Sequence, residues 1–450
     1  MCIRDRHVKG KLKGDCYACF FELYRHQPSP YAIFLQNEEF AICSLSPELF
    51  FSVEKQKILL KPMKGTAPRG LYDTEDKKQY DLLFASQKDR AENVMIVDMI
   101  RNDIGKVAMP GTVNVLKLFE IEAHPTIWQM TSTITAKTTG KLKDLLFALF
   151  PCASITGAPK CNTMRIIKKL ERIPRGLYTG TIGYITPSNK MHFNVAIRTL
   201  TINRYKNTFD YGVGGGIIWD SDPVKEYQEC VSKVQILKEK WDDFTLLETL
   251  RWEPKKGYYL LKQHLQRLRK SAFYFKFPYP YEKILHLLSK VVRYKKIPCI
   301  IRLLLARNGR IKAQWKPLPA RKEIYTLKLA SKPIDETNLF LYHKTTNRKL
   351  YDTMRSTAKN VDDVLLYNSR GEITETTIGN IVVEINNQLI TPPISSGLLP
   401  GVYREYLISK KRIIEKVVKL NDLCNIKKIY VINSVRGFIN ARLIWGKQHN

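Results

Sequence analysis

A strand that ends in three consecutive glycines and leads into a charged helix is the stretch that most constrains this chain. Residues 211–218 read as that strand, and its glycines at 214–216 let a ligand approach bare backbone N–H groups closely. The sequence Asp-Ser-Asp-Pro at 220–223 then supplies a capping residue and the proline that begins a helix. The fold must therefore bring a strand end and a helix start to one place.

The helix that follows carries Glu226, Glu229 and Lys233 at a spacing that puts their side chains on one face. Two carboxylates beside a lysine suit a hard cation together with an anion, because magnesium uses one or two protein carboxylates and leaves room for an anionic substrate. A solvated helix face is the commoner role of such a pattern. The adjacent glycine strand favours a binding site for a cation and an anion over a solvated face.

The length of 450 residues exceeds what a single core supports and suggests two or three domains. Because the character of the sequence changes after residue 241, we expect domains at residues 1–241 and 242–450. From Tyr31 onward, alternating strand-forming segments predict antiparallel sheets, with helices over 73–101 and 141–149 and a strand over 192–202. The second part alternates strand and helix. The predicted fold class is α/β of the α+β kind in both parts.

The net charge of +32 raises the question of a nucleic-acid partner. Lysine and arginine are spread over the whole length without a nucleic-acid-binding motif, so we expect none, and anionic substrates account for the charge. A degenerate scaffold or nucleic-acid binder is the alternative from another class, and it predicts steeply salt-dependent binding to DNA or RNA.

The sequence shows no apolar run of about 20 residues and no secretory signal, which predicts a cytoplasmic protein without a membrane partner. Nine cysteines scattered through the chain argue against a disulfide framework. The opening Met-Cys-Ile-Arg-Asp-Arg looks like the translation of a sequencing adaptor, so we expect the true N-terminus to be missing.

Six motifs follow one another in the first part of the chain. They are Lys-Pro-Met-Lys-Gly-Thr-Ala-Pro-Arg-Gly from 61, Arg-Ala-Glu-Asn-Val-Met-Ile-Val-Asp-Met-Ile-Arg-Asn-Asp from 90, Ser-Ile-Thr-Gly-Ala-Pro-Lys from 154, Arg-Gly-Leu-Tyr-Thr-Gly-Thr-Ile-Gly-Tyr from 175, Ile-Arg-Thr-Leu from 197, and the glycine strand with its Glu-Tyr-Gln-Glu. Together they cover residues 14 to about 240. In this order they resemble the chorismate-utilising enzymes.

The resemblance implies a role for each matching residue. Glu92 and Glu229 match the magnesium ligands, and Asp89 and Glu226 match carboxylates behind them. Glu48 matches the general acid that helps the 4-hydroxyl of chorismate leave. The groups expected to hold the chorismate carboxylates are Ser154, Tyr178, Arg198, Gly214, Gly215 and Gly216, with Lys233 beside them.

Lys64 discriminates between the activities in that family. Anthranilate synthases have an alanine in this motif, whereas aminodeoxychorismate synthases have a lysine, thought to attack C2 of chorismate before ammonia enters at C4. A buried lysine that loses its proton near neutrality is nucleophilic. The resemblance therefore favours amination at C4. Ala18 and Phe20 depart from the glutamine and asparagine usual in the family, which puts amination efficiency in question.

The second part resembles the fold-type IV pyridoxal-phosphate enzymes, most closely the aminodeoxychorismate lyases, from 244 to about 446. The resemblance rests on Phe340-Leu-Tyr-His-Lys-Thr-Thr, on Gly371-Glu-Ile-Thr-Glu-Thr-Thr-Ile-Gly-Asn, and on the Gly-Leu-Leu-Pro-Gly-Val-Tyr-Arg that begins at 397. It implies Lys344 as the lysine that binds the cofactor covalently and shuttles protons, and Glu375 as the carboxylate facing the pyridinium nitrogen. The remaining implied contacts are Arg267, Thr376, Thr377, Gly401 and Val402 for the phosphate, and Asn433, Ser434 and Arg436 for the substrate.

Together the two resemblances imply a two-step route: magnesium-dependent amination of chorismate, then pyridoxal-phosphate-dependent loss of pyruvate to give 4-aminobenzoate for folate. No cysteine lies in a glycine-rich glutaminase elbow, so ammonia is expected from a separate glutamine amidotransferase subunit. We also expect a homodimer through the second domain. The rivals are an anthranilate- or isochorismate-forming first domain and a branched-chain or D-amino-acid aminotransferase as the second.

Overall fold

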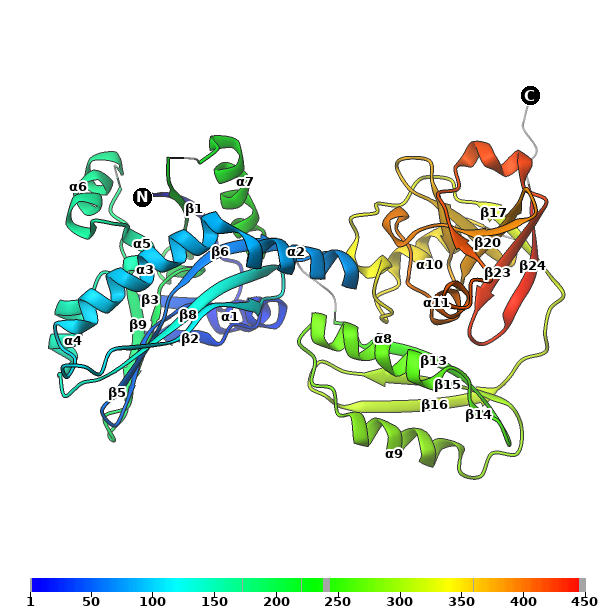
Figure 1. Ribbon diagram of the computed structural model, residues 1–450, viewed down its shortest axis with the longest axis horizontal. Helices are drawn as coiled ribbons and strands as arrows, with labels where there is room; N and C mark the ends of the chain where they lie inside the picture. The colour runs from blue at the N-terminus through cyan, green and yellow to red at the C-terminus, as the bar shows by residue number, and fades with distance from the viewer. Residues whose placement is uncertain (1, 172, 220, 238–242, 359, 445–450) are drawn as a thin grey trace. The chain divides into compact units, whose positions relative to one another are not determined.

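The computed structural model describes residues 2–171, 173–219, 221–237, 243–358 and 360–444, and the chain divides into two compact units. Unit 1 comprises Met1–Gly70 and Asp76–Trp241, and unit 2 comprises Leu71–Glu75 and Asp242–Asn450. Each unit mixes sheets and helices (Figure 1). The predicted fold class is confirmed for both.

Within its described residues, unit 1 contains two antiparallel sheets. The first has the order β1-β12-β11-β3-β2, and the second has the order β6-β8-β5-β4-β10-β9 with β7 beside β8. The strands are β1 (Cys2–Lys11), β2 (Tyr31–Gln36), β3 (Phe40–Ser46), β4 (Leu49–Glu54), β5 (Lys57–Lys61), β6 (Met63–Pro68), β7 (Asn114–Ala123), β8 (Ile127–Lys137), β9 (Thr181–Ile185), β10 (Met191–Val195), β11 (Thr199–Asn203) and β12 (Thr208–Ile217). The helices are α1 (Cys16–His26), α2 (Asp73–Ala85), α3 (Gln87–Gly105), α4 (Leu142–Leu149), α5 (Ala153–Thr156), α6 (Lys160–Leu170), α7 (Pro223–Val234) and η1 (Gln235–Leu237).

The core of unit 1 forms where α3 covers the second sheet. Ile96, Val97 and Ile100 of the helix pack against strand residues such as Phe51 and Ile134, all of them buried. Asp89 and Glu92 lie on the same face of α3, one to two turns before Ile96, so the packing that buries the apolar residues also turns the two carboxylates toward β6.

Two predicted elements are each interrupted. The helix expected over 73–101 is two helices, because Ser86 caps a new one: its Oγ accepts from the N–H of Asp89 at 3.3 Å and donates to the carboxylate of Asp89 at 2.5 Å. The strand expected over 192–202 breaks between Val195 and Thr199, and its halves join different sheets. Arg198 at this break has a left-handed φ of 49°.

Within its described residues, unit 2 also contains two sheets. One has the antiparallel order β14-β13-β15-β16, and the other has the mixed order β19-β18-β17-β24-β23-β20-β21-β22. The strands are β13 (Leu246–Glu253), β14 (Gly257–Tyr258), β15 (Cys299–Leu305), β16 (Ile311–Pro317), β17 (Ile324–Leu329), β18 (Asp363–Tyr367), β19 (Ile373–Thr376), β20 (Asn380–Ile385), β21 (Gln388–Thr391), β22 (Ile414–Glu415), β23 (Lys428–Asn433) and β24 (Gly437–Leu443). The helices are α8 (Leu261–Tyr274), α9 (Tyr281–Val292), α10 (Lys349–Ser356) and α11 (Val402–Ser409), with η2 (Leu339–Leu341), η3 (Ile394–Ser396) and η4 (Leu420–Asn425).

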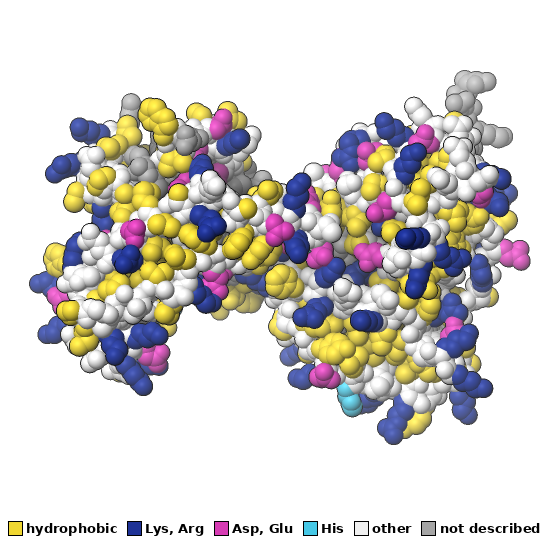
Figure 2. All heavy atoms as spheres, viewed as in Figure 1, with side chains coloured by type: hydrophobic (Ala, Val, Ile, Leu, Met, Phe, Trp, Pro, Cys, Tyr) yellow, Lys and Arg dark blue, Asp and Glu magenta, His cyan; other side chains and the backbone are white. Residues whose placement is uncertain are grey.

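The distribution of charged side chains and the character of the helices bear on the expected nucleic-acid and membrane partners. On the face in Figure 2, lysine and arginine side chains are scattered rather than gathered in one patch. Over the part of the chain that the structure describes, no helix has both the length and the apolar character needed to cross a membrane.

Candidate active sites

Lys64 on β6 faces Glu92 on α3. Its Nζ lies 4.0 Å from Oε2 of Glu92, and the two side chains are only 14% and 19% exposed. Burial lowers the pKa of Lys64, although the charges of Glu92 and Glu48 oppose the shift. A lowered pKa leaves more of the neutral amine, which is the nucleophilic form, near neutral pH.

Glu48 occupies the turn between β3 and β4 and is almost fully buried. Its Oε1 accepts a hydrogen bond of 2.6 Å from Oγ of Ser154 on α5. Burial raises the pKa of Glu48 to about 7, while Ser154 and the charge of Lys64 pull it down. The carboxyl group therefore carries a proton over part of the neutral range, as a general acid requires.

The glycine strand and α7 meet as the spacing predicts. Nζ of Lys233 donates to the carbonyl of Gly214 at 2.8 Å and pairs with Glu229 at 2.6 Å. A Cβ placed on Gly215 would lie 2.8 Å from Oε2 of Glu226, so glycine allows this close approach. The charges of Lys233 and Glu229 act on Lys64, which places α7 beside the Lys64–Glu92 pair.

Asp222 caps α7, accepting from the N–H groups of Val224 and Lys225 at 2.9 Å, whereas Asp220 of the same prediction lies outside the described residues. β1 runs along the glycine strand, and its residues at 3–5 pair with Gly216, Gly215 and Gly214. Part of the glycine backbone is therefore engaged in the sheet.

The carboxylates predicted to bind magnesium come from two helices. Burial raises the pKa of Glu92, and the charges of Asp89 and Glu226 raise it further against the pull of Lys64. Concentrated negative charge of this kind is relieved by a cation. Among the described residues, no three His, Cys, Asp or Glu side chains form a metal-binding group. Magnesium needs only one or two protein carboxylates, so the assignment of Glu92 and Glu229 to it stays a prediction.

Arg198 and Tyr178, predicted to hold chorismate carboxylates, flank the first sheet. Nη1 of Arg198 donates to Gln27 at 3.2 Å, and burial lowers the pKa of its guanidinium. The ring of Tyr178 covers Gly212, where an added Cβ would lie 2.2 Å from the ring. The role of both residues toward the chorismate carboxylates stays a prediction.

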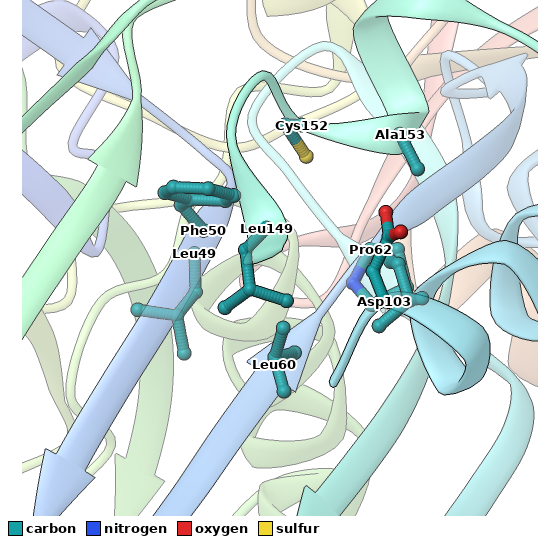
Figure 3. Close-up of a pocket in the computed structure, with 9 residues that line it drawn as sticks. Leu49, Phe50, Leu60, Pro62, Asp103, Leu149, Cys152 and Ala153 are labelled. Carbon is teal, nitrogen blue, oxygen red and sulfur yellow. The ribbon is translucent and has the colours of Figure 1, made fainter. Parts of the chain in front are cut away.

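A small cavity lies in unit 1, at the start of β4 (Figure 3). Leu49, Phe50, Leu60 and Leu149 line one side, with Asp103 and Cys152 opposite. Its volume of about 10 Å³ has room for one water molecule at most. The cavity is therefore too small to be the chorismate site.

In unit 2, Lys344 lies between η2 and α10. Its carbonyl accepts from the N–H of Leu247 at 2.9 Å, which fixes the lysine against β13. Burial lowers the pKa of Lys344 to about 8, and the charges of Arg267 and Arg348 lower it further, while Glu248 and Glu375 oppose. A lysine in this state can act both as an amine nucleophile and as a proton carrier.

Glu375 on β19 is held by three donors. Its Oε1 accepts from the hydroxyl of Tyr351 at 2.7 Å and from the N–H of Leu399 at 3.1 Å, and its Oε2 accepts from the amide of Asn380 at 3.1 Å. Burial raises the pKa of Glu375 to about 7, against the pull of the bonds from Tyr351 and Leu399 and of the charge of Lys344. A fixed buried carboxylate near the lysine suits a protonated ring nitrogen.

Arg267 on α8 forms a bidentate ion pair with Glu248 of β13. Nε and Nη2 donate to the two carboxylate oxygens at 2.9 and 2.7 Å, and Nη1 donates to the carbonyl of Pro400 at 3.1 Å. His264 adds a bond of 2.7 Å to Glu248. The guanidinium is thereby aimed at the start of α11, where the resemblance places the phosphate.

The predicted phosphate contacts surround that helix start. Gly401 caps α11, and a Cβ there would lie 1.9 Å from Oδ1 of Asn380, so only glycine fits beside Val402. The hydroxyl of Thr376 donates to the carbonyl of Gly379 at 2.9 Å, and that of Thr377 donates to Asp363 at 2.5 Å. These threonines brace the turn, and their contact with a phosphate stays a prediction.

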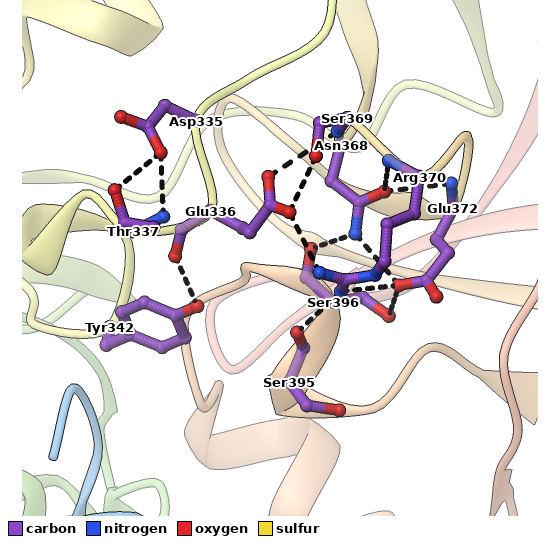
Figure 4. Close-up of polar contacts among 10 residues, drawn as sticks. All are labelled: Asp335, Glu336, Thr337, Tyr342, Asn368, Ser369, Arg370, Glu372, Ser395 and Ser396. Carbon is purple, nitrogen blue, oxygen red and sulfur yellow. Dashed lines mark hydrogen bonds and ion pairs between the residues drawn. The ribbon is translucent and has the colours of Figure 1, made fainter. Parts of the chain in front are cut away.

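A polar network braces the loop that leads to Lys344 (Figure 4). Arg370 pairs with Glu336 at 2.8 Å and with Glu372 at 2.9 Å, and Tyr342 donates to the carbonyl of Glu336 at 2.7 Å. The loop before the lysine is thus tied to the turn between β18 and β19.

Several residues that hold these sites were missed by the sequence reasoning. Asn380 lies in the same sequence motif as Glu375 and could have been predicted from it. The partners of Glu375 and Arg267 on other elements have no sequence pattern that marks them. The missed residues are Asn93, Gln129, Glu248, Arg348, Tyr351 and Asn380.

Two protein-family models match the chain, each over a different stretch. Residues 6–239 match the chorismate binding enzyme family, and the chain belongs to that family. Residues 245–444 match amino-transferase class IV. The chain is 45% identical over 232 residues to aminodeoxychorismate synthase component 1 of Salmonella typhimurium, covering 51% of each chain. It therefore spans about half the length of the curated relatives it matches.

Two solved structures are each similar to less than half of this chain. A putative amino-acid aminotransferase from Mesorhizobium loti is 38% identical, with a TM-score of 0.44, and is covered completely by 45% of this chain. A putative 4-amino-4-deoxychorismate lyase from Legionella pneumophila is 22% identical, with a TM-score of 0.40, over 46% of this chain and 86% of that one.

Proposed function

We propose that the chain makes 4-aminobenzoate in two steps. Unit 1 would aminate chorismate to 4-amino-4-deoxychorismate, and unit 2 would eliminate pyruvate from that product. The observation that carries the proposal is the burial of Lys64 between Glu92 and Glu48, with the pKa of the lysine lowered and that of Glu48 raised to about 7. An alanine-containing motif at this position would offer no nucleophile.

In the first step each group has a defined task. The protonated Glu48 gives its proton to the departing 4-hydroxyl while the amine of Lys64 forms a bond to C2 of chorismate. Ammonia then bonds to C4, and Lys64 departs from C2. A bound magnesium ion, held by Glu92 and Glu229, supplies positive charge for a substrate carboxylate.

In the second step Lys344 moves the proton. Its pKa of about 8 lets it accept and return a proton near neutral pH. Glu375, fixed by Tyr351 and Asn380, would accept the hydrogen bond of the ring nitrogen, and Arg267 would hold the phosphate. Bound pyridoxal phosphate supplies the electron sink, and formation of the aromatic ring drives pyruvate loss.

An aminotransferase activity is the second candidate for unit 2. The match of residues 245–444 to amino-transferase class IV supports it. Incubation with an amino donor and a keto acid separates the two, because only an aminotransferase yields the new amino acid. An anthranilate-forming unit 1 is disfavoured by Lys64.

The partner, location and assembly belong to the same proposal. The relative's name, component 1, supports a separate glutamine amidotransferase subunit as the source of ammonia. A cytoplasmic location, a role in folate synthesis and a homodimer through unit 2 stay predictions.

Two variants test the assignment of the steps by mass spectrometry of the products. With chorismate, magnesium, ammonium and pyridoxal phosphate, Lys64→Ala should give neither product, while it still converts supplied 4-amino-4-deoxychorismate to 4-aminobenzoate. Lys344→Ala should accumulate 4-amino-4-deoxychorismate. Full activity in either variant would refute the role of that lysine.

A further inference from the structure

The strand that carries Lys64 is irregular at that residue. In the pairing of β6 with β8, Met63 lies opposite Thr131 and Thr66 lies opposite Gln129, so β6 contains one extra residue there. Gly65 takes a left-handed φ of 93°. This is a β-bulge, which re-aims the side chain that it carries.

Two side-chain amides satisfy the backbone of the bulge. Nδ2 of Asn93 donates to the carbonyl of Lys64 at 3.3 Å, and Nε2 of Gln129 donates to the carbonyl of Gly65 at 2.8 Å. Both side chains are buried, at 1% and 6% exposure. A buried carbonyl without a partner costs about 1–3 kcal/mol, so the amides stabilise an irregular strand against a regular one.

Each amide is itself fixed in orientation. Ser132 donates its hydroxyl to Oδ1 of Asn93 at 2.5 Å, and Thr66 donates to Oε1 of Gln129 at 3.1 Å. The NH₂ groups must therefore point toward the bulge. Asn93 directly follows Glu92 on α3, so one turn of helix sets both the carboxylate and the backbone of its lysine partner.

We propose that Asn93 and Gln129 are positioning residues that hold the bulge so that Lys64 faces Glu92 and Glu48. Side chains alternate between the faces of a strand, so removing the extra residue from the register turns Lys64 to the opposite face of the sheet. The inference rests on the proposed amination for its catalytic consequence. The geometry of the bulge stands without it.

The test compares Gln129→Met and Asn93→Ala with Thr131→Val in the full chain. Thr131 lies on the same strand as Gln129, opposite Met63, and its hydroxyl donates to the carbonyl of Glu120 at 3.3 Å rather than to the backbone of Lys64 or Gly65. Loss of the amides should lower kcat for amination by about a hundredfold, because displacement of about 1 Å has that effect, while KM for chorismate stays within about twofold. The control should keep both values.

A crystal structure of Gln129→Met gives the second readout. We expect Nζ of Lys64 displaced from Glu92 relative to the Thr131→Val structure. An unchanged kcat, or Lys64 at its original place in the variant, overturns the inference. If the unsubstituted chain does not aminate chorismate but the lysine moves in the variant, the proposed function fails and the positioning role stands. If Asn93→Ala does not fold, Gln129→Met decides.

Discussion

Replacing Glu248 by glutamine tests the buried charge cluster of unit 2. Burial alone would raise the pKa of Glu248, but Arg267 and His264 lower it from 4.5 to about 2. At about 1.4 kcal/mol per pH unit, this span corresponds to about 3 kcal/mol of stability. Because the folded-state pKa is depressed, the contribution is fully present above pH 4.5 and is lost as the pH falls toward 2.

At pH 7 we therefore expect Glu248→Gln to lose about 3 kcal/mol of unfolding free energy, since Arg267 keeps its charge without a carboxylate partner. The chain has two units, so the free energy is read locally, from hydrogen exchange in urea of peptides from β13 and α8.

The control is Glu253→Gln on the same strand. Glu253 pairs with Arg251 and Lys256 near the surface, so its loss should cost no more than about 1 kcal/mol. Equal unfolding free energies for the two variants would refute the assignment of Glu248 as the anchor of Arg267.

Three further predictions concern the chemistry. The rate of amination should fall as the pH rises through about 7, because Glu48 must be protonated. The hydrogen bond from Ser154 lowers the pKa of Glu48, so Ser154→Ala should move this fall to higher pH. An unchanged pH–rate profile in the variant would contradict this. Arg348→Gln should raise the pKa of Lys344 and slow incorporation of pyridoxal phosphate at pH 7 by about threefold to tenfold, measured by absorbance; an equal rate would count against it. Removing magnesium with EDTA should stop amination, while conversion of supplied 4-amino-4-deoxychorismate continues. Loss of both activities would contradict the assignment of the metal to unit 1.

The sequence was sufficient for elements with a strong local signal. The spacing of Glu226, Glu229 and Lys233 predicted one helix face, and α7 places Glu226 and Lys233 against the glycine strand. The interruptions at Ser86 and Arg198 were missed, because a serine within a helical pattern and an arginine with positive φ depend on capping and tertiary context.

Contacts between distant elements could not be predicted in the same way. Gln129 is one of many polar residues on a strand, and only the register of β6 against β8 shows that its amide meets the backbone of Gly65. The role of Glu248 likewise depends on α8, which brings Arg267 and His264 within hydrogen-bond distance of its carboxylate. Such partners depend on packing of the whole unit.

The most direct measurement of the central claim is the product formed from chorismate. The protein is incubated with chorismate, magnesium, ¹⁵N-ammonium and pyridoxal phosphate, and the products are followed by mass spectrometry. The two-step proposal predicts ¹⁵N-labelled 4-aminobenzoate together with pyruvate. Labelled anthranilate instead would contradict the role given to Lys64, and 4-amino-4-deoxychorismate that never proceeds to 4-aminobenzoate would contradict the lyase role of Lys344.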